Sequence, residues 1–584
     1  MNDIADITNQ HEHHPDHPAG HPAWLADACF YEIYPQSFND SNGDGIGDIP
    51  GITAKLDYIR DLGCNALWIN PCYDSPFKDA GYDVRDYTKV APRYGTNEDL
   101  IALFNAAHDR NMHVLLDLVP GHTSEEHAWF QASARPDPAD RVVDAAPDDT
   151  TPGDTTDHAD GRVNVSERYI WTDCWISGGD GLPFIGGETE RDGTYILNFF
   201  KCQPALNYGF AHPRQPWQKP ALGPEALATC DALLDVMRFW LSRGADGFRV
   251  DMADSLVKHD EDGKPYTIRT WQHMFAQIRP EFPEAAFVSE WGHPHESMEA
   301  GFDMDFYLDW RWNGKPNGYN HLLRDTDTPL AHGGDRSYFN ADSGASITPF
   351  LNEYLPQLRD CERAGGRFSL ITCNHDTLRT AQRLTERELK IAYGMILTMP
   401  GCPFVYYGDE IGMRYIPLPT FEGGYVRTGS RTPMQWGGDD VAIESRYLPM
   451  DVAPGSPTVA TEILRDDSLY HWIRQVLAMR ADRTALRSGA AFDVIAAPEE
   501  GRAFAFLRTA AGNGNEPVGG EAQGDRVLVA MNPGRGTETI DVPAPRAAAM
   551  AGGDPLHIGV VHSERAADGM RIVLGPQSFA VLPW

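Results

Sequence analysis

The sequence predicts an α/β fold built on a (β/α)8 TIM barrel, with a subdomain inserted after the third strand and an antiparallel β domain at the C-terminus. Three observations favour this fold class. Strand-like and helix-like segments alternate from Cys29 onwards, which is typical of a parallel α/β architecture. The alternation stops between 123 and 210, and short β-type runs replace it beyond residue 488. A chain of 584 residues is long enough for a barrel with insertions and one further domain.

The barrel needs eight strands, and eight short apolar segments supply them in order. They span 30–35, 66–70, 114–119, 247–251, 287–290, 304–308, 368–373 and 403–407. Amphipathic segments with helical spacing lie between many of these strands. The expected helices cover 53–62, 97–110, 227–243, 268–278, 386–397 and, after the eighth strand, 468–480.

Changes in composition place the domain boundaries. Residues 24–122 and 211–487 are assigned to the barrel, and 123–210 to the inserted subdomain B, which holds an Asp- and Pro-rich stretch (136–161) and Trp-rich patches around Trp171 and Trp175. We expect this insertion on the catalytic face, with the acidic stretch as a mobile loop. Gly- and Pro-rich turns between β-type runs make 488–584 a β-sandwich domain.

Residues 1–23 form a His-rich segment that admits two interpretations. Its histidines could bind a metal ion, but prolines interrupt any regular scaffold, so a flexible tail is the prediction. The histidines are His11, His13, His14, His17 and His21, and the prolines are Pro15, Pro18 and Pro22.

Composition excludes several classes of partner. The net charge of −35 argues against nucleic acid and anionic membranes, whereas a neutral sugar is compatible with it. No apolar run approaches the ~20 residues needed to cross a bilayer, and the first twenty residues show no secretory signal. Nine cysteines without framework spacing indicate reduced thiols, so we expect a cytoplasmic protein, as a monomer or small homo-oligomer.

Three carboxylates lie at the C-terminal ends of predicted strands: Asp251, Glu290 and Asp376. All strand ends of a barrel open onto one face, so these acids can converge there although they are far apart in sequence. Converging carboxylates suit retaining glycoside hydrolysis, in which one acid attacks the anomeric carbon and another protonates the leaving oxygen. Any one of them could instead cap a following helix. Three together, with Arg249 and His375 beside them, favour catalysis.

The ordered motifs of this chain resemble those of the α-amylase family of glycoside hydrolases, in particular the oligo-1,6-glucosidase and α-glucosidase branch. The resemblance runs from Phe30 to the C-terminus. It rests on FYEIYPQSF, DSNGDGIGD, GYDVRDY, DLVPGH, QPALN, GFRVD, SEW, NHD, PFVYYGDEIGM and SRTPMQW.

The resemblance implies a role for each acid. Asp251 would be the nucleophile, Glu290 the general acid and then base, and Asp376 the third acid that holds sugar hydroxyls and stabilises the transition state. Arg249 lies two residues before Asp251 on one strand face, and we expect it to lower the pKa of that carboxyl. Neighbouring carboxylates should raise the pKa of Glu290, so that it starts protonated. The implied substrate contacts are Asp79, Tyr82, His122, Gln203, Arg249, Met252, His375 and Arg431.

Three of these contacts carry specific expectations. Tyr82 would be an aromatic platform under the terminal glucose. Asp79 and Arg431 would pair and close the pocket beyond the non-reducing end, which makes the enzyme exo-acting. The alternative for that pair is an ordinary surface ion pair.

A structural Ca2+ ion, or Mg2+ in its place, is expected in the loop that starts at Asp40. Oxygen ligands at alternating positions in a Gly-punctuated loop are typical of these cations. The resemblance places the site away from the chemistry. Its ligands would be Asp40, Asn42, Asp44, Asp48 and the carbonyl of Ile46.

Three departures from the family pattern limit what can be transferred. Gly121 replaces an Asn, which puts in doubt the metal site that many α-amylases build there. Ala205 replaces a common Asp. Met252 follows the nucleophile where Val tends to accompany α-1,6 and Ala or Thr α-1,4 specificity, so linkage preference stays open.

The sequence therefore predicts a retaining exo-α-glucosidase that acts on disaccharides or short oligosaccharides. Two alternatives remain. A transglucosidase, or an isomerase of the trehalose synthase or sucrose isomerase type, would use the same covalent intermediate. A non-catalytic sugar-binding relative would have lost its acids, and the presence of Asp251, Glu290 and Asp376 argues against it.

Overall fold

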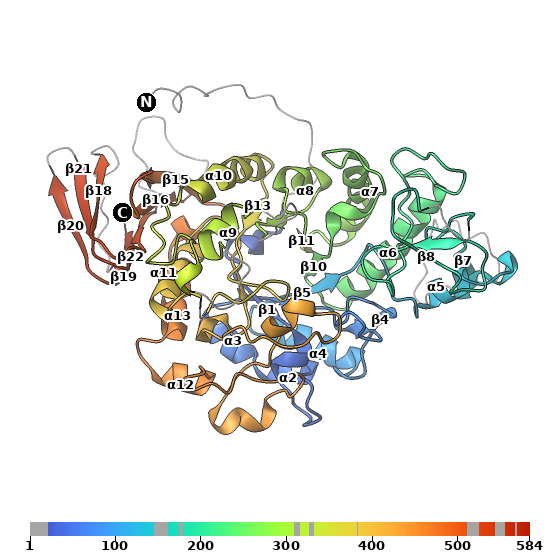
Figure 1. Ribbon diagram of the computed structural model, residues 1–584, viewed down its shortest axis with the longest axis horizontal. Coiled ribbons are helices and arrows are strands. Elements are labelled where there is room, and N and C mark those ends of the chain that lie inside the picture. Colours follow the sequence, from blue (N-terminus) through green and yellow to red (C-terminus); the bar gives the residue numbers. More distant parts are fainter. Residues whose placement is uncertain are drawn as a thin grey trace.

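The computed structural model describes residues 21–144, 162–174, 179–308, 316–325, 332–381, 383–510, 525–543, 555–566 and 569–583. Eight parallel strands form a near-closed barrel, which confirms the predicted fold (Figure 1). A bridge between Ile371 and Phe404 joins the last two strands. The strands are β1 (Phe30–Ile33), β2 (Ala66–Ile69), β5 (His113–Leu118), β10 (Gly247–Val250), β11 (Ala286–Ser289), β12 (Met304–Phe306), β13 (Arg367–Ser369) and β14 (Phe404–Tyr406).

The strands are apolar because both of their faces are buried, as in other parallel sheets. Gly247 starts β10 with φ of 142°, and a Cβ atom there would lie 1.8 Å from the carbonyl oxygen of Ala286 on β11. Only glycine allows β10 and β11 to approach in this register. That register brings the residues after the two strands, Asp251 and Glu290, side by side at the C-terminal end of the barrel.

Helices alternate with the strands and surround the barrel (Figure 1). The single helix predicted at 53–62 is two helices separated at Lys55, and the first begins earlier than expected because Asp48 caps its N-terminus and Pro50 occupies its first turn. The main helices are α2 (Ile49–Ala54), α3 (Leu56–Leu62), α4 (Asn97–His108), α6 (Pro224–Leu241), α7 (Pro265–Glu281), α8 (Pro294–Ala300), α9 (Gly318–Leu323), α10 (Thr348–Arg363), α11 (Glu386–Ile396), α12 (Val459–Leu464) and α13 (Leu469–Asp482). Among the described helices none is long and apolar enough to span a membrane.

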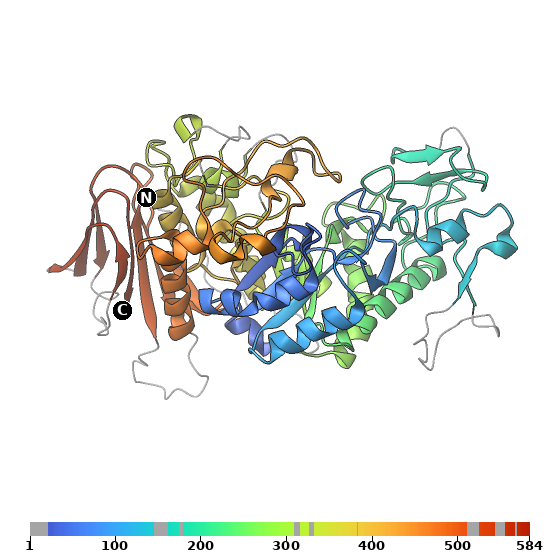
Figure 2. The same ribbon diagram turned by 90° about the horizontal axis from the view of Figure 1, so that it is seen from below.

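The segment between β5 and α6 holds a short helix and two small antiparallel strand pairs. These are α5 (Ala128–Ser133), β6 (Val142–Asp144) with β7 (Arg162–Asn164), and β8 (Phe184–Gly186) with β9 (Thr194–Ile196). They lie at one end of the molecule, opposite the C-terminal strands (Figure 2). Most of the predicted acidic loop (145–161) and Trp175 fall outside the described residues.

The C-terminal region forms two antiparallel sheets, as predicted. One contains β15 (Ala491–Ala496), β16 (Phe504–Thr509), β17 (Arg526–Asn532), β22 (Ser578–Pro583) and β19 (Leu556–Ile558), and the other β18 (Glu538–Pro543), β21 (Gly569–Leu574) and β20 (Val561–Ala566). Leu528 and Ala580 of the first sheet share an apolar core with Ile540 and Ile572 of the second. The exact domain boundaries stay predictions.

The predicted tail (1–23) lies almost wholly outside the described residues. Of its histidines, His21 is described, and its Nδ1 atom is 2.7 Å from Oδ1 of the buried Asp303. This contact ties the start of the described chain to the barrel.

Candidate active site

Arg249 of β10 joins the two predicted catalytic residues. Its Nη1 atom donates to Oδ1 of Asp251 and to Oδ1 of Asp117, both at 2.9 Å, and its Nη2 atom lies 2.7 Å from Oε2 of Glu290. The four side chains are buried. A single planar guanidinium therefore fixes the nucleophile candidate and the acid candidate relative to each other.

Burial dominates the proton affinity of both acids. It raises the pKa of Asp251 to about 7 although Arg249 acts in the opposite direction, and Asp117 and Asp376 add to the rise. The predicted direction of the Arg249 effect is confirmed, since Arg249 acts to lower the pKa of Asp251, but desolvation exceeds this attraction and the net pKa is raised. Burial also raises the pKa of Glu290 to about 8, with Asp251 and Asp376 contributing, which confirms the predicted direction.

Met252 follows Asp251 in a left-handed conformation, with φ of 43° and ψ of 46°. Its backbone N–H donates to Oε2 of Glu290 at 2.9 Å. A non-glycine residue in this region is strained, and such strain occurs where the surrounding structure enforces it. The bond explains the conformation here, because it ties the residue after one acid to the carboxylate of the other.

Asp376 lies between two arginines. Arg427 donates from Nη1 to Oδ1 of Asp376 at 2.6 Å, and Arg431 donates from Nη2 to the same oxygen at 3.0 Å. Burial acts to raise the pKa of Asp376, but its charged surroundings outweigh burial and hold the pKa below its ordinary value. This carboxylate is ionised, in contrast to Glu290.

Tyr82 and His375 stack, with ring centroids 5.3 Å apart and an angle of 14° between the planes. The hydroxyl of Tyr82 donates to Oδ2 of Asp117 at 3.0 Å and lies 2.7 Å from Nε2 of His375. His122 contacts the same tyrosine, since its Nε2 atom is 3.1 Å from the Tyr82 carbonyl oxygen. The predicted platform and both predicted histidines therefore share one wall of the site.

Asp79 accepts a hydrogen bond from Nε2 of Gln203 at 2.8 Å, and Nη2 of Arg427 lies 3.9 Å from its Oδ1. The predicted ion pair with Arg431 is wrong. Arg431 is held at Asp376 because its Nε atom also donates to the His375 carbonyl at 2.9 Å. Arg427, four residues earlier in a 3-10 helix (Tyr425–Ser430), links Asp79 to Asp376 instead.

Comparison with known proteins shows the family of this chain. The family model described as alpha amylase, catalytic domain, matches residues 32–489. The chain belongs to the alpha-amylase family. A trehalose synthase/amylase TreS from Mycolicibacterium smegmatis is 31% identical over 505 residues, covering 80% of this chain and 77% of that protein. An oligo-1,6-glucosidase from Heyndrickxia coagulans is 28% identical over 591 residues, covering 89% of this chain and 94% of that protein.

Solved structures support the same fold. Eubacterium rectale Amy13B matches with a TM-score of 0.71 at 22% identity, covering 97% of this chain and 96% of that one. An isomaltulose synthase from Erwinia rhapontici matches with a TM-score of 0.70 at 23% identity, covering 96% and 99%. Membership of the alpha-amylase family, with α-glucosidases among the relatives, makes the protein a glycoside hydrolase and confirms the resemblance seen in the sequence.

The predicted metal loop of this alpha-amylase family member lies apart from the hydrogen bonds described above. Its carboxylates bind backbone amides: Asp40 accepts from Gly43 and Gly45, both at 2.7 Å, and Asp48 accepts from Gly51 at 2.6 Å. The oxygen donors suit Ca2+. Within the described ranges, however, no three acidic, His or Cys side chains are grouped as metal ligands. The ion therefore stays a prediction.

The Gly121 departure has a structural explanation. A Cβ atom at this position would lie 2.7 Å from Nδ2 of Asn198, whose amide group fills the space. The Asn198 side chain is 3.0 Å from Nδ1 of His122 and accepts from Nζ of Lys258 at 2.9 Å. An ammonium group beside this position repels a cation, so the structure gives no support for the second metal site.

Sequence reasoning missed several residues that hold the site together. The sequence did indicate a site role for Asp117, because this residue lies at a strand end inside the DLVPGH motif. It gave no indication of a role for Arg427, since this residue lies outside every motif and only the turn at 423–430 brings it to Asp79. Further contacts that periodicity does not reveal come from Glu32, Trp68, Asn70, Asn198 and Lys258.

Proposed function

We propose that the protein is a retaining, exo-acting α-glucosidase that releases glucose from the non-reducing end of short α-glucosides through a covalent glucosyl-enzyme intermediate. The observation that carries the proposal is the guanidinium of Arg249, which contacts both Asp251 and Glu290 at neighbouring strand ends. Contacts of this length bring the two carboxyl groups close together, as retention requires.

The electrostatics support the acid role of Glu290. Burial and the charges of Asp251 and Asp376 raise its pKa to about 8, so it keeps a proton near neutral pH. In the proposed mechanism Asp251 attacks the anomeric carbon while Glu290 protonates the leaving oxygen. Esterification removes the negative charge of Asp251, which lowers the proton affinity of Glu290. Glu290 then takes a proton from water as the water attacks the intermediate.

The surroundings of Asp79 support exo action. Gln203, Arg427 and Asp376 form a connected polar wall with Asp79, and Gly423 lies against it so closely that a Cβ atom there would be 2.9 Å from Oδ1 of Asp79. A wall at this position would leave room for one terminal glucose and block a longer chain. Asp376 would hold the hydroxyls of that glucose, because its ionised carboxylate accepts hydrogen bonds.

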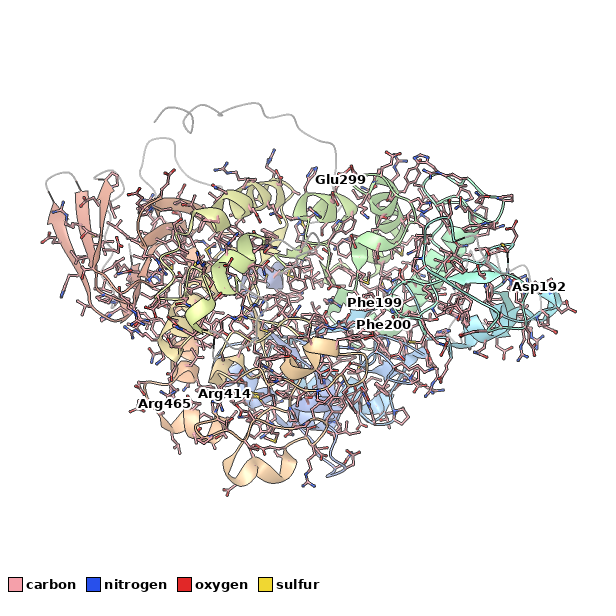
Figure 3. The ribbon with its side chains drawn as sticks, in the orientation of Figure 1. Asp192, Phe199, Phe200, Glu299, Arg414 and Arg465 are labelled. Carbon is pink, nitrogen blue, oxygen red and sulfur yellow. The ribbon has the colours of Figure 1, made fainter. Side chains whose placement is uncertain are left out.

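The transglucosidase or isomerase alternative has support of its own. Relatives carry the name trehalose synthase, and structural neighbours are named isomaltulose synthase. In this chain an aromatic surface near the site could hold an acceptor sugar. Phe199 and Tyr425 are 51% and 58% exposed, and the ring of Phe200 lies 5.7 Å from that of Tyr425. Figure 3 shows Phe199 and Phe200 close to each other. Aromatic faces of this kind stack on apolar sugar faces and exclude water.

A product profile separates the two functions. The purified protein is incubated with maltose, isomaltose, sucrose, trehalose, kojibiose and nigerose, and products are separated by chromatography. Hydrolysis gives glucose from each accepted α-glucoside, whereas transfer or isomerisation gives new disaccharides or trisaccharides with little free glucose. Asp251→Asn is the matched control for contaminating activity. No turnover of any α-glucoside, p-nitrophenyl α-glucoside included, would contradict both functions.

A further inference from the structure

Glu32 of β1 is a fully buried carboxyl group inside the barrel that the proposed mechanism does not use. Its Oε1 atom is 2.8 Å from Nδ1 of His375, and Asn70 donates to the same oxygen at 3.3 Å. Its Oε2 atom is buried and has no hydrogen-bond partner within the described part of the chain. Because His375 contacts Tyr82 and Asp376 through its other nitrogen, the proton arrangement at Glu32 bears on the predicted sugar contacts.

Consider first a neutral His375 with its proton on Nδ1. Nε2 would then be an acceptor, and the Tyr82 hydroxyl would have to donate to it. That hydroxyl has a single hydrogen, so its 3.0 Å contact with the carboxylate of Asp117 would become an unbridged contact between two oxygens. Nε2 would also present a lone pair to Oδ2 of Asp376 at 3.3 Å. Both contacts are repulsive.

The other tautomer removes both repulsive contacts. With the proton on Nε2, the ring donates to the Tyr82 oxygen, Tyr82 donates to Asp117, and the Nε2 proton faces the carboxylate of Asp376. Nδ1 is then an acceptor with one lone pair, while the amide of Asn70 donates to Oε1 of Glu32 at 3.3 Å. The 2.8 Å contact between Nδ1 and Glu32 then needs a proton on Glu32.

A doubly protonated His375 beside an ionised Glu32 would use the same number of protons, but two observations argue against it. The unpartnered Oε2 atom of Glu32 would carry charge in a buried environment, whereas in the protonated acid it is a neutral oxygen. Burial holds the pKa of His375 well below its ordinary value; the charge of Asp376 acts in the opposite direction, but the guanidiniums of Arg431, Arg249 and Arg427 add to burial.

We infer that Glu32 is a positioning residue that stays protonated in the resting enzyme and donates to Nδ1 of His375, which fixes the ring as an Nε2–H donor to the Tyr82 hydroxyl, facing Asp376. This inference rests on the proposed function for its consequence, since Tyr82 and Asp376 are the predicted glucose contacts that the ring would hold in place.

The electrostatic surroundings of Glu32 agree with this assignment. Burial raises its pKa well above the ordinary value, and the negative charge of Asp376 adds to the rise. Asn70, Arg249 and the backbone N–H of His375 act in the opposite direction without overcoming burial. The His375 ring, which is the other contact partner of Glu32, is neutral and therefore adds no positive charge that would ionise the carboxyl group.

Two spectroscopic measurements on the full-length protein test the inference without any substrate. The infrared spectrum at about pH 9, where Asp251 and Glu290 are largely ionised, should contain a carboxylic acid C=O band that disappears in Glu32→Gln. NMR of 15N-histidine-labelled protein, assigned with a His375→Asn sample, should show His375 protonated at Nε2 and bare at Nδ1.

Kinetics add a matched pair of variants. Glu32→Gln keeps a neutral donor to Nδ1, so kcat/KM on the accepted α-glucoside should stay within about threefold of wild type. Glu32→Met has similar length without a donor, and kcat/KM should fall by about tenfold or more at unchanged circular dichroism. Equal losses in both variants would overturn the positioning role. An Nδ1–H tautomer, an imidazolium, or no band change in Glu32→Gln would overturn the protonation of Glu32, whatever the enzyme's substrate proves to be.

Discussion

Asp251 is unfavourable for folding in the ionised form that attack on the anomeric carbon needs, and Glu290 is unfavourable in the ionised form that activates water in the second step. Each folded-state pKa, about 7 and about 8, lies above the ordinary value of its residue, so the folded protein binds these protons more tightly than the unfolded chain does. The stability associated with the raised pKa is fully present below the unfolded pKa and is lost as pH rises through the folded pKa. Ionised Asp251 and Glu290 are thus held in place by the rest of the fold.

The first prediction follows from this loss of stability as pH rises. Asp251→Asn and Glu290→Gln should each abolish turnover and should be more stable than wild type at high pH. For Asp251→Asn the gain should grow between about pH 4 and pH 7 and reach at most ~4 kcal/mol, since each pKa unit is ~1.4 kcal/mol. Urea unfolding at several pH values measures it. Wild-type activity in either folded variant, or a stability difference independent of pH, would contradict the prediction.

Met252 is the residue at which we expect linkage preference to be set. Its backbone is fixed by Glu290, so its side chain starts from a rigid position beside both acids. Apolar contacts of this kind discriminate between substrates by about 1–3 kcal/mol. Met252→Val and Met252→Thr should therefore shift the ratio of kcat/KM between α-1,6- and α-1,4-linked disaccharides by about tenfold or more. If both variants keep the wild-type ratio, linkage choice lies elsewhere, with the insertion at 123–210 as the next region to test.

The role of a site residue could be predicted where the residue lies in a recognisable motif. It could not be predicted where only the packing of the fold decides which side chains meet. Asp251, Glu290 and His375 could be located because each follows a buried strand in a recognisable motif. The partner of Asp79 could not, because Arg427 and Arg431 are separated by one helical turn and only the observed anchors of Arg431 decide between them. The direction of the Arg249 effect on the pKa of Asp251 was predicted, but the larger effect of burial was not, since the degree of burial has no local signature in the sequence.

The segment that carries Arg427 is the element that would close the pocket. Glu422 at the start of this segment pairs with Arg93 at 2.9 Å, and the carbonyl of Gly423 accepts a hydrogen bond from Arg427. Positive φ at Glu422, Gly423 and Tyr425 shapes the turn that aims Arg427 at Asp376 and Asp79. The proposed exo action would therefore depend on this turn as a whole.

Replacing Arg427 should weaken the exo preference. In Arg427→Leu, Asp376 loses one of its two arginines and Asp79 loses its nearest cation, so kcat/KM for maltose should fall by about tenfold or more. Products longer than glucose should appear from maltooligosaccharides. Arg465→Leu is the control and should be unchanged, because Arg465 is half-exposed, pairs with Glu386 and lies well apart from Phe199 and Phe200 in Figure 3. Mixed oligosaccharides released from starch by the wild-type protein would already show that the pocket is open.

The loop at 40–48 is the second element with a defined expectation. Asp48 caps α2 and Asp40 organises the preceding turn, so a cation bound there would stabilise the junction between them. Treatment with EDTA should lower the melting temperature and leave kcat nearly unchanged, and added Ca2+ should restore the melting temperature. Asp44→Asn should be insensitive to EDTA. Identical melting curves of untreated and EDTA-treated protein would exclude a stabilising metal at this loop.

Strand positions were the most predictable part of the fold, since all eight barrel segments became strands with ends shifted by a few residues at most. Their apolar composition follows from burial on both faces. The start of α2 was missed because the apolar pattern begins after Asp48 and Pro50, which determine where the helix starts. The small strand pairs β6–β7 and β8–β9 show no strong alternation of apolar and polar residues, and their pairing depends on how the insertion folds back on itself.

At the scale of the whole molecule, the barrel and the inner C-terminal sheet share one core. Phe504, Phe506, Val529 and Phe579 belong to the same apolar cluster as the barrel strands. Gly394 of α11 fits against the ring of Phe579, where a Cβ atom would approach to 2.9 Å. A continuous core of this kind predicts that barrel and sheet unfold together.

Arg508 of β16 gives the most direct test of that coupling. It is fully buried, and it donates to the carbonyls of Thr398 at 2.7 Å, Arg487 at 2.7 Å and Ala490 at 3.1 Å. Arg508→Leu leaves these buried carbonyls without their donor, which should destabilise the protein by ~2–4 kcal/mol and lower its melting temperature by several degrees. Arg571→Leu on β21, which removes an exposed ion pair with Asp541, should have little effect. Calorimetry should show a single shifted transition for Arg508→Leu, with KM unchanged. A separate early transition of the C-terminal sheets would mean that the two regions fold independently despite their shared core.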